Sequence, residues 1–258
     1  MGEGSYEVFA VRYATRETRK SECYYRYHAY GEPDAAIGMD YFFWVLRDGD
    51  RVVLVDTGYS VAAGERRSRT TLCSPLEALA RAGVEPAGVE HLILTHLHYD
   101  HTGAVGAFRD TPTTVHRRDL DFWTGPLAAK PQFAPIVEPE EVAAVAAAPR
   151  LTVIDGETAM LGPGIEAFCV GGHSPGQLVL LVDAADGPVV LASDAIHYYE
   201  ELELDRPFEV FVDLAEMVVG YDVLRGLAAR PGAVLVAGHD PEVCARFPSD
   251  DGVVYRIA

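Results

Sequence analysis

The chain has 258 residues, 49% of them hydrophobic, which suits one large α/β domain with a sizeable core and no disulfide support. Its formal net charge is −18. A surface of this sign repels phosphate backbones and anionic lipid headgroups, so we expect a small-molecule substrate and neither nucleic acid nor a membrane as partner.

The cysteine pattern and the start of the chain predict a cytoplasmic protein. No CxxC pair occurs among the four cysteines, which we expect to be reduced and packed as small apolar side chains. Residues 1–7 have neither the basic nor the apolar stretch of a secretory signal. No apolar run reaches the roughly 18 residues that a spanning helix needs.

The first half of the chain predicts strands followed by an alternation of helix and strand. Strands are expected at Tyr6–Ala14, Tyr41–Leu46, Arg51–Val55 and Leu92–Leu94. A hairpin turn is expected at Asp48-Gly49. A helix is expected to begin at Ser74-Pro75, with Glu77 completing a capping box, and to end at Gly83.

The second half again predicts short strands, after an inserted segment of helices and loops at about residues 117–150. These strands are expected at Leu151–Ile154, Ile165–Val170, Leu178–Val182, Val189–Ala192 and Ala233–Ala237. A helix is expected from about Leu214 to Ala229, with Asp213 and Glu216 as its capping pair. Two strand-rich halves, each with helices, favour a single domain, residues 1–258, built as a four-layer sandwich with two facing sheets.

The strongest chemical signal is a cluster of polar residues directly after the apolar strand at Leu92–Leu94. It contains His96, His98, Asp100 and His101. In an extended segment His96 and His98 project to the same side, and a turn at Asp100 can bring the last two residues to a neighbouring point. Imidazole nitrogens and carboxylate oxygens are ligands of zinc and related ions in catalytic sites. A solvated histidine-rich loop is the alternative.

Three later residues repeat the same arrangement of an apolar strand followed by a metal-type ligand. They are His173, Asp194 and His239. Each one alone could be a turn histidine, a capping aspartate or a surface histidine. Their recurrence at strand ends favours metal binding by all three.

These motifs resemble the metallo-β-lactamase superfamily. The residues His96-x-His98-x-Asp100-His101, His173, Asp194 and His239 stand in the family's order, and Val55-Asp56-Thr57-Gly58 is similar to an early family motif. The resemblance implies an αβ/βα sandwich with two divalent metal ions per chain, expected to be Zn²⁺, between the sheets. Asp194 would bridge the two ions, and Asp56 would orient a histidine ligand. The resemblance assigns His96, His98 and His173 to the first ion and Asp100, His101 and His239 to the second.

Within the superfamily the chain is most similar to the N-acyl-homoserine lactonase branch. The likeness lies in residues 98–103, residues 172–177 and Asp194-Ala195. Lactonases of this branch commonly carry a tyrosine three residues after the bridging aspartate, whereas this chain has His197 followed by Tyr198. Either side chain is expected to donate a hydrogen bond to the developing oxyanion.

The resemblance implies a hydrolase that opens a lactone, an N-acyl-homoserine lactone or a similar cyclic ester. A hydroxide bridging the metal ions would attack the carbonyl carbon, and Asp100 would pass a proton to the leaving group. A glyoxalase II-like thioesterase and a hydrolase of another ester or a cyclic amide stay open. So do a mononuclear-iron oxygen enzyme, a nuclease, which the charge disfavours, and a binding module, which would be expected to lose ligands.

Other prominent residues are expected to be structural. His91 and His116 lie beside apolar strand segments and are expected to pack there. The aromatic segment 23–30 could cover the substrate, contact a second copy in a homodimer or pack onto the core. Phe122-Trp123 is expected to pack on a helix, and Arg66–Arg69 is expected to be a solvated loop.

Overall fold

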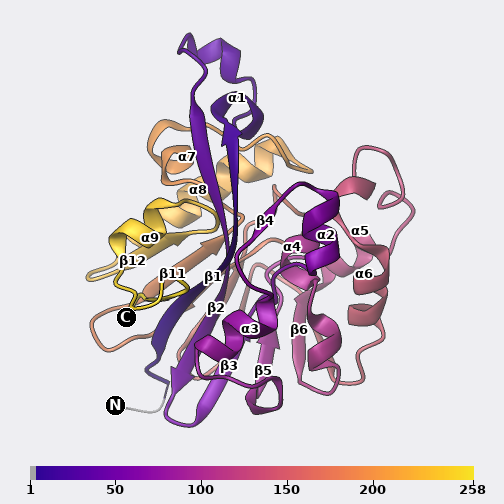
Figure 1. Cartoon of the computed structure of the whole chain (residues 1–258), viewed down its shortest axis with the longest axis vertical. Helices are drawn as coiled ribbons and strands as arrows, with labels where there is room; N and C mark the ends of the chain where they lie inside the picture. Colours follow the sequence, from indigo (N-terminus) through magenta and orange to yellow (C-terminus); the bar gives the residue numbers. More distant parts are fainter. Residues whose placement is uncertain (1–3) are drawn as a thin grey trace.

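The computed structural model describes residues 4–258, which form two β-sheets with helices on their outer sides (Figure 1). The first sheet has the strand order β13-β1-β2-β3-β5-β6-β7, and β4 also pairs with β1. Its strands are β1 Glu7–Arg19, β2 Ala36–Asp48, β3 Arg51–Val55, β4 Thr70–Thr71, β5 His91–Ile93, β6 Thr113–His116, β7 Leu151–Ile154 and β13 Val254–Arg256.

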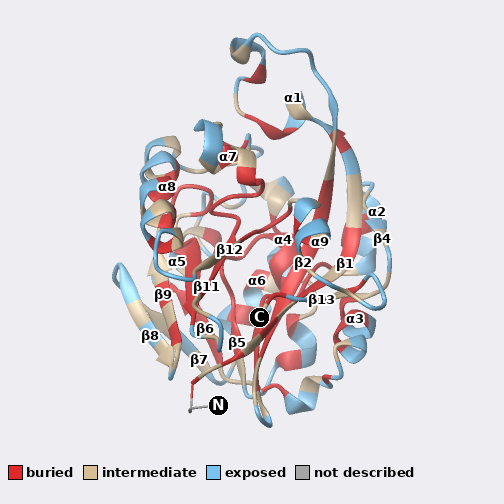
Figure 2. Ribbon diagram, turned by 90° about the vertical axis from the view of Figure 1, so that its left-hand side faces the viewer, coloured by how far each residue is buried: buried red, intermediate tan, exposed pale blue. Residues whose placement is uncertain are grey.

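The second sheet has the order β12-β11-β10-β9-β8, in which only β11 and β12 run parallel. Its strands are β8 Thr158–Gly162, β9 Ile165–Cys169, β10 Leu178–Val182, β11 Val189–Ser193 and β12 Val234–Ala237. Figure 2 shows the buried residues concentrated in the strands and in the connections at the strand ends.

The helices cover the two sheets from outside. The α-helices are α1 Lys20–Cys23, α2 Val61–Arg66, α3 Pro75–Arg81, α4 Tyr99–Thr102, α5 Arg117–Trp123, α6 Pro139–Ala146, α7 Tyr199–Leu204, α8 Leu214–Ala228 and α9 Glu242–Arg246. The 3₁₀ turns are Tyr27–Tyr30, Pro86–Gly88, Val105–Phe108 and Ala134–Ile136. In Figure 1, α2, α5 and α6 lie to one side of the strands, α7, α8 and α9 lie toward the other, and α3 overlaps the strands β2 and β3 in this view. None of these helices is long and apolar enough to cross a membrane.

The predicted sandwich is confirmed, with differences in particular strands. β3, β7 and β10 have the predicted bounds, whereas β1 and β2 are longer and form an extended hairpin that reaches α1 at the top of Figure 1. Four strands, β4, β6, β8 and β13, were not predicted. β6 reads Thr-Thr-Val-His and is buried by its neighbours despite its polar composition, and β8 is partly exposed.

The strand β7 belongs to the first sheet, although it lies in the second half of the chain. It pairs in parallel with β6, residue 113 opposite residue 151. Neighbouring parallel strands need a long crossover connection. The segment at about 117–150, described above as an insertion, supplies that crossover with α5 and α6.

The predicted helix starts are confirmed in α3 and only partly in α8. Ser74 and Glu77 form the reciprocal capping box of α3. In α8 Asp213 accepts from the backbone N–H of Glu216 at 2.9 Å. The Glu216 carboxylate does not accept from the backbone N–H of Asp213, because it is paired with Arg118 at 2.7 Å.

The aromatic segment 23–30 and the segment Arg66–Arg69 both pack onto the body of the protein. In the aromatic segment, Tyr24 and Tyr27 are buried, and the Tyr24 ring lies 5.7 Å from that of Tyr198. The prediction of a solvated loop at Arg66–Arg69 is wrong for Arg67 and Arg69. Arg67 donates to the carbonyl oxygen of Pro135 at 2.8 Å, and Arg69 donates to the Tyr99 hydroxyl at 3.3 Å.

Candidate metal centre

The seven metal-type residues predicted from the sequence meet at one end of the two sheets. They come from the connections that follow β5, β9, β11 and β12, so each is placed by the end of a buried strand. Each of these residues is at most 8% exposed. The seven are His96, His98, Asp100, His101, His173, Asp194 and His239.

Asp194 lies at the middle of this cluster. Its Oδ1 is 3.3 Å from His101 Nε2 and 3.2 Å from His239 Nε2. Its Oδ2 is 3.3 Å from His173 Nε2 and 3.1 Å from His197 Nε2. His239 Nε2 also lies 3.3 Å from Oδ2, so the two oxygens together face four imidazoles.

Four groups of three side chains in this cluster could hold a metal ion, since their ligand atoms lie within 4.8 Å of one another. Two of the groups share no residue, so the cluster has room for two ions. The groups are His96–His98–His173, Asp100–His101–His239, His96–His101–Asp194 and His173–Asp194–His197.

Hydrogen bonds behind three of the histidines determine which ring nitrogen faces the centre. Nδ1 of His173 donates to the carbonyl of Val210 at 2.8 Å, and Nδ1 of His239 donates to the carbonyl of Asp40 at 2.7 Å. Nδ1 of His101 lies 2.8 Å from Asp56 Oδ2. Because carbonyl and carboxylate oxygens accept, Nδ1 carries the proton and the lone pair of Nε2 is free for a metal.

Unpartnered nitrogens in the cluster fit a metal centre. Within residues 4–258, the Nε2 atoms of His96, His98 and His101 are buried without a hydrogen-bond partner. Nδ1 of His98 lies only 2.9 Å from Nε2 of His173. Buried polar atoms normally have partners, and metal ions at this point would provide them.

The protonation of the cluster also fits metal binding. Burial, together with the neighbouring imidazoles, holds the pKa of His96 and His98 well below the usual range. Burial lowers the pKa of His173 to about 3, against the opposing field of Asp194. Burial alone would raise the pKa of Asp194, but His239 and His101 outweigh it and hold that pKa well below its usual value. Burial would lower the pKa of His101 and His197, but Asp194 and Asp56 raise that of His101 well above its usual range, and Asp194 and Glu201 raise that of His197 to about 9. His96, His98 and His173 thus present neutral imidazoles and Asp194 an ionised carboxylate, the forms that bind metals.

Asp56 and Asp119 anchor the loops that carry the ligands. Asp56 accepts from the backbone N–H and the hydroxyl of Thr95, both at 2.8 Å, in addition to its contact with His101. This is the orienting position expected for it.

Asp119 was missed by the sequence reasoning. Its buried carboxylate accepts from the backbone N–H of Leu97 at 2.7 Å, from that of Gly176 at 3.0 Å and from the Ser174 hydroxyl. It therefore ties the loop of His96 and His98 to the loop of His173. The only available signal was an acidic residue just after the Thr-Val-His of β6, a strand that had not been predicted.

His197 and Tyr198 lie differently from what a substrate-facing donor requires. Nε2 of His197 faces Asp194, and its Nδ1 lies 3.4 Å from Oε1 of Glu201. The Tyr198 hydroxyl donates to the carbonyl of Gly38 at 3.1 Å and lies 3.5 Å from the sulfur of Cys23. Both nitrogens of His197 thus face carboxylates, and the Tyr198 hydroxyl is used in packing.

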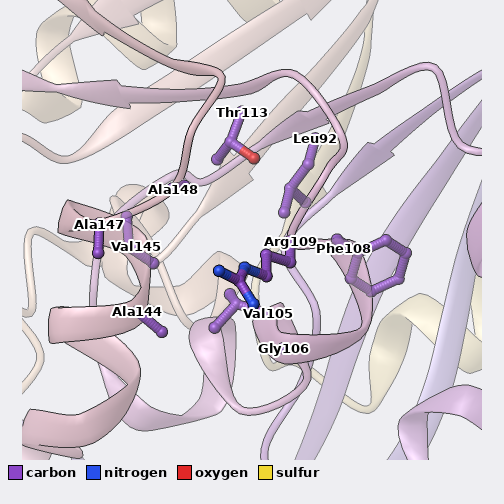
Figure 3. A pocket seen from close by; sticks show the side chains of 10 residues that line it. All are labelled: Leu92, Val105, Gly106, Phe108, Arg109, Thr113, Ala144, Val145, Ala147 and Ala148. Atoms are coloured by element: carbon purple, nitrogen blue, oxygen red, sulfur yellow. The ribbon is translucent and has the colours of Figure 1, made fainter.

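A separate apolar cavity of about 320 Å³ lies between α6 and the turn at Val105–Phe108 (Figure 3). Its lining contains none of the metal-type side chains, so it is distinct from the metal centre. The lining residues are Leu92, Val105, Gly106, Phe108, Arg109, Thr113, Ala144, Val145, Ala147 and Ala148.

The fold and this cluster of histidines and aspartates define a class of protein. The sequence profile of the metallo-beta-lactamase superfamily matches residues 39–239, and the chain belongs to that superfamily. The resemblance seen in the motifs is thereby confirmed.

Individual relatives indicate the branch of the superfamily to which the chain is similar. An N-acyl homoserine lactonase from Bacillus sp is 31% identical over 176 residues, which are 66% of this chain and 64% of that relative. An N-acyl homoserine lactone hydrolase, solved with N-hexanoyl-L-homoserine at its catalytic metal center, has a TM-score of 0.78 at 21% identity and covers 95% of this chain and 97% of its own. AidC, a dizinc quorum-quenching lactonase, has a TM-score of 0.75 at 19% identity and covers 93% of this chain and 90% of its own.

Proposed function

We propose that this protein is a dinuclear metal-dependent hydrolase that opens a lactone, an N-acyl-homoserine lactone or a similar cyclic ester. The observation that carries the proposal is Asp194, whose two oxygens lie 3.1–3.3 Å from the Nε2 atoms of four imidazoles. Two ions held on the two sides of this carboxylate would lie close together, as in two-metal hydrolases. The similarity to lactonases supports the substrate class.

The proposed ligand sets follow the groups in the structure. His96, His98 and His173 would hold one ion, Asp100, His101 and His239 would hold the other, and Asp194, which lies between these residues, would be shared by both. We propose zinc, because this donor set of imidazoles and carboxylates suits it and because a dizinc lactonase shares the fold. When bound, the ions supply Lewis acidity toward the ester carbonyl and a hydroxide nucleophile at neutral pH.

The remaining steps belong to residues of the chain. The carboxyl group of Asp100 lies beside His101 Nε2 at 3.8 Å and His239 Nε2 at 3.9 Å, at the edge of the cluster, and is 8% exposed. From that edge the Asp100 carboxylate could take up the proton that the attacking water gives up and pass it to the alkoxide that leaves as the ring opens. Asp56 and Asp119 keep the ligand loops in place, so that little reorganisation is needed during the reaction.

We further propose that the enzyme acts in the cytoplasm. All four cysteines, Cys23, Cys73, Cys169 and Cys244, are free. Free thiols are typical of reducing compartments.

Metal analysis combined with a substrate panel tests the proposed function. The metal-replete protein should contain about two ions per chain and hydrolyse N-acyl-homoserine lactones faster than thioesters, cyclic amides or phosphodiesters. Removal of the metal by a chelator should abolish the activity, and addition of Zn²⁺ should restore it.

Two results would contradict the proposal. A reproducible single metal equivalent per chain would favour the mononuclear-iron oxygen enzyme. Clear preference for a thioester with a full metal load would favour the glyoxalase II-like alternative.

A further inference from the structure

His197 is placed within the metal centre rather than beside it. Its side chain is 2% exposed, and its ring stacks on that of Phe208 with 3.5 Å between centroids and an interplanar angle of 13°. The ring centroid of His173 lies 4.7 Å away. This packing leaves the imidazole little freedom to turn, so its two nitrogens keep the directions described above.

The surroundings of His197 repeat those of His101. In His101 one nitrogen meets the outer carboxylate of Asp56 at 2.8 Å, and the other meets Asp194 Oδ1 at 3.3 Å. In His197 one nitrogen faces the outer carboxylate of Glu201 at 3.4 Å, and the other meets Asp194 Oδ2 at 3.1 Å. Each ring therefore lies between a buried outer carboxylate and one oxygen of Asp194.

We propose that His197 is a further metal ligand through Nε2, on the side of the centre formed by His173 and Asp194. This inference rests on the proposed dinuclear centre and adds a protein ligand to it. Nε2 of His197 and the ligand atoms of His173 and Asp194 lie within 4.8 Å of one another, so a single ion can reach all three.

The chemistry of a neutral imidazole supports this role. Such a ring has one N–H, and a proton on Nδ1, which lies 3.4 Å from Glu201 Oε1 without forming a hydrogen bond, leaves a lone pair on Nε2. That lone pair would face the negative Oδ2 of Asp194 at 3.1 Å. A cation could take the place of a proton on Nε2 and be bound by both atoms.

Glu201 serves as a positioning residue behind this ligand. Its side chain is fully buried, and its Oε1 accepts from the backbone N–H groups of His197 at 2.7 Å and Tyr198 at 2.9 Å. Its Oε2 accepts from the hydroxyl of Tyr221 at 3.1 Å. Metal-ligating histidines commonly have such a carboxylate at the second nitrogen.

The test measures metal binding directly and uses no lactone. In the Co²⁺-substituted protein, ¹H NMR in water shows exchangeable, hyperfine-shifted N–H resonances from the imidazoles that bind the paramagnetic ion. His197→Phe keeps an aromatic ring to stack on Phe208 and removes both nitrogens. It should lose one of these resonances and weaken the binding of one Co²⁺ by about 100-fold, at least as much as the loss of a residue that only supports a ligand.

Two further variants keep the test interpretable. His91→Phe is the matched control, because His91 is a partly buried histidine bound to Thr114 at 2.8 Å outside the centre, and it should leave the Co²⁺ spectrum unchanged. Glu201→Gln should shift the His197 resonance without losing it and weaken Co²⁺ binding by about 10-fold. It tests the same contact if His197→Phe fails to fold.

Two outcomes would overturn the inference. In the first, His197→Phe keeps every shifted resonance and the wild-type Co²⁺ affinity. In the second, affinity falls while every resonance remains, which would make His197 a hydrogen-bond donor to Asp194 and no ligand. Failure of the proposed function has a different signature, since a wild-type protein that binds two Co²⁺ ions but opens no lactone leaves this assignment standing.

Discussion

Hydrogen bonds at the outer ring nitrogens hold single histidines of the metal centre in place before any ion binds. The outer nitrogen of His173 is bound to a backbone carbonyl, that of His239 to another, and that of His101 to Asp56. Such contacts select the tautomer and the direction of the ring. The centre is therefore preorganised by ordinary hydrogen bonds, and its ligand atoms converge on Asp194.

Substitution of Asp194 tests its bridging role. Asp194→Ala removes the carboxylate that faces the four imidazoles, so the two ions lose their common ligand. We expect kcat/KM for the lactone to fall on the order of 10³-fold, since several kcal/mol of charge stabilisation depend on the placement of the ions. Steady-state kinetics with elemental analysis would measure this, and wild-type turnover with a full metal load would show that Asp194 is no bridge.

At the scale of elements, helix α8 places the loop that carries His173. Gly172 has a φ of +84°, and a Cβ there would meet the backbone of Met217 in α8. The carbonyl of Gly172 accepts from the N–H groups of Val212 at 2.8 Å and Asp213 at 3.0 Å, just before the helix begins. The helix start and the ligand loop therefore form one packed unit, in which only glycine fits at position 172.

Gly172→Ala should displace His173 by forcing the loop away from α8. Strain of this kind costs about 1–3 kcal/mol, and a displaced ligand weakens metal binding by about 10–100-fold. Thermal unfolding and Zn²⁺ titration would measure both effects. The matched control is Gly226→Ala within α8, where an added Cβ meets nothing within 4 Å, and which should leave both quantities unchanged or improved. Equal behaviour of the two variants would contradict the argument.

In helix α6, the titration of Glu141 should change the free energy of unfolding with pH. Burial raises the pKa of Glu141 to about 7, against the hydrogen bond from the Thr102 hydroxyl at 3.0 Å. Because this pKa lies above the ordinary value of 4.5 for a glutamate, the folded state binds the proton more tightly than the unfolded chain does. Its contribution to stability is fully present below pH 4.5 and is lost as the pH rises through about 7.

Glu141→Gln should therefore melt higher than the wild type at pH 8, and the difference should shrink toward pH 4.5. We expect about 2–4 °C at pH 8, the shift that about 1 kcal/mol produces in a domain of this size. Scanning calorimetry at the two pH values would measure it. Glu140→Gln, at an exposed neighbour on the same helix, should show no such pH dependence. A constant difference at all pH values would mean that Glu141 is ionised throughout.

At the scale of the whole molecule, the chain is strongly acidic, and its metal centre concentrates part of this negative charge in the interior. The chain carries a net charge of −18 and buries Asp56, Asp100 and Asp194 around one point. Bound divalent ions offset this concentration of negative charge. Homodimer formation remains a prediction, which light scattering during size-exclusion chromatography would check.

Removal of the metal should lower the stability of the entire fold. Ions that bind only the folded state stabilise it by about 4 kcal/mol at 1,000 times their dissociation constant, which corresponds to about 10 °C in melting temperature. Differential scanning fluorimetry before and after dialysis against a chelator would measure the drop, and added Zn²⁺ should reverse it. An unchanged melting temperature after complete metal removal would contradict this coupling.

The sequence by itself determined the features that depend on local pattern. The metal-type residues were found because each follows a short apolar strand, and residues at the ends of buried strands converge at one edge of a sheet. The capping box of α3 was predictable because Ser74 and Glu77 interact within one turn. These signals lie within a few residues of one another and need no knowledge of the partners across the fold.

Only the tertiary structure decided the features that depend on distant partners. Asp119 anchors the ligand loops because it meets Leu97 and Ser174, which lie 22 and 55 residues away in the sequence. The direction of His197 follows from its stacking on Phe208 and from the carboxylates on its two sides, so its identity alone could not separate a substrate donor from a metal ligand. Which contacts a side chain makes is set by the residues that folding brings beside it, and those are not encoded in its immediate neighbours.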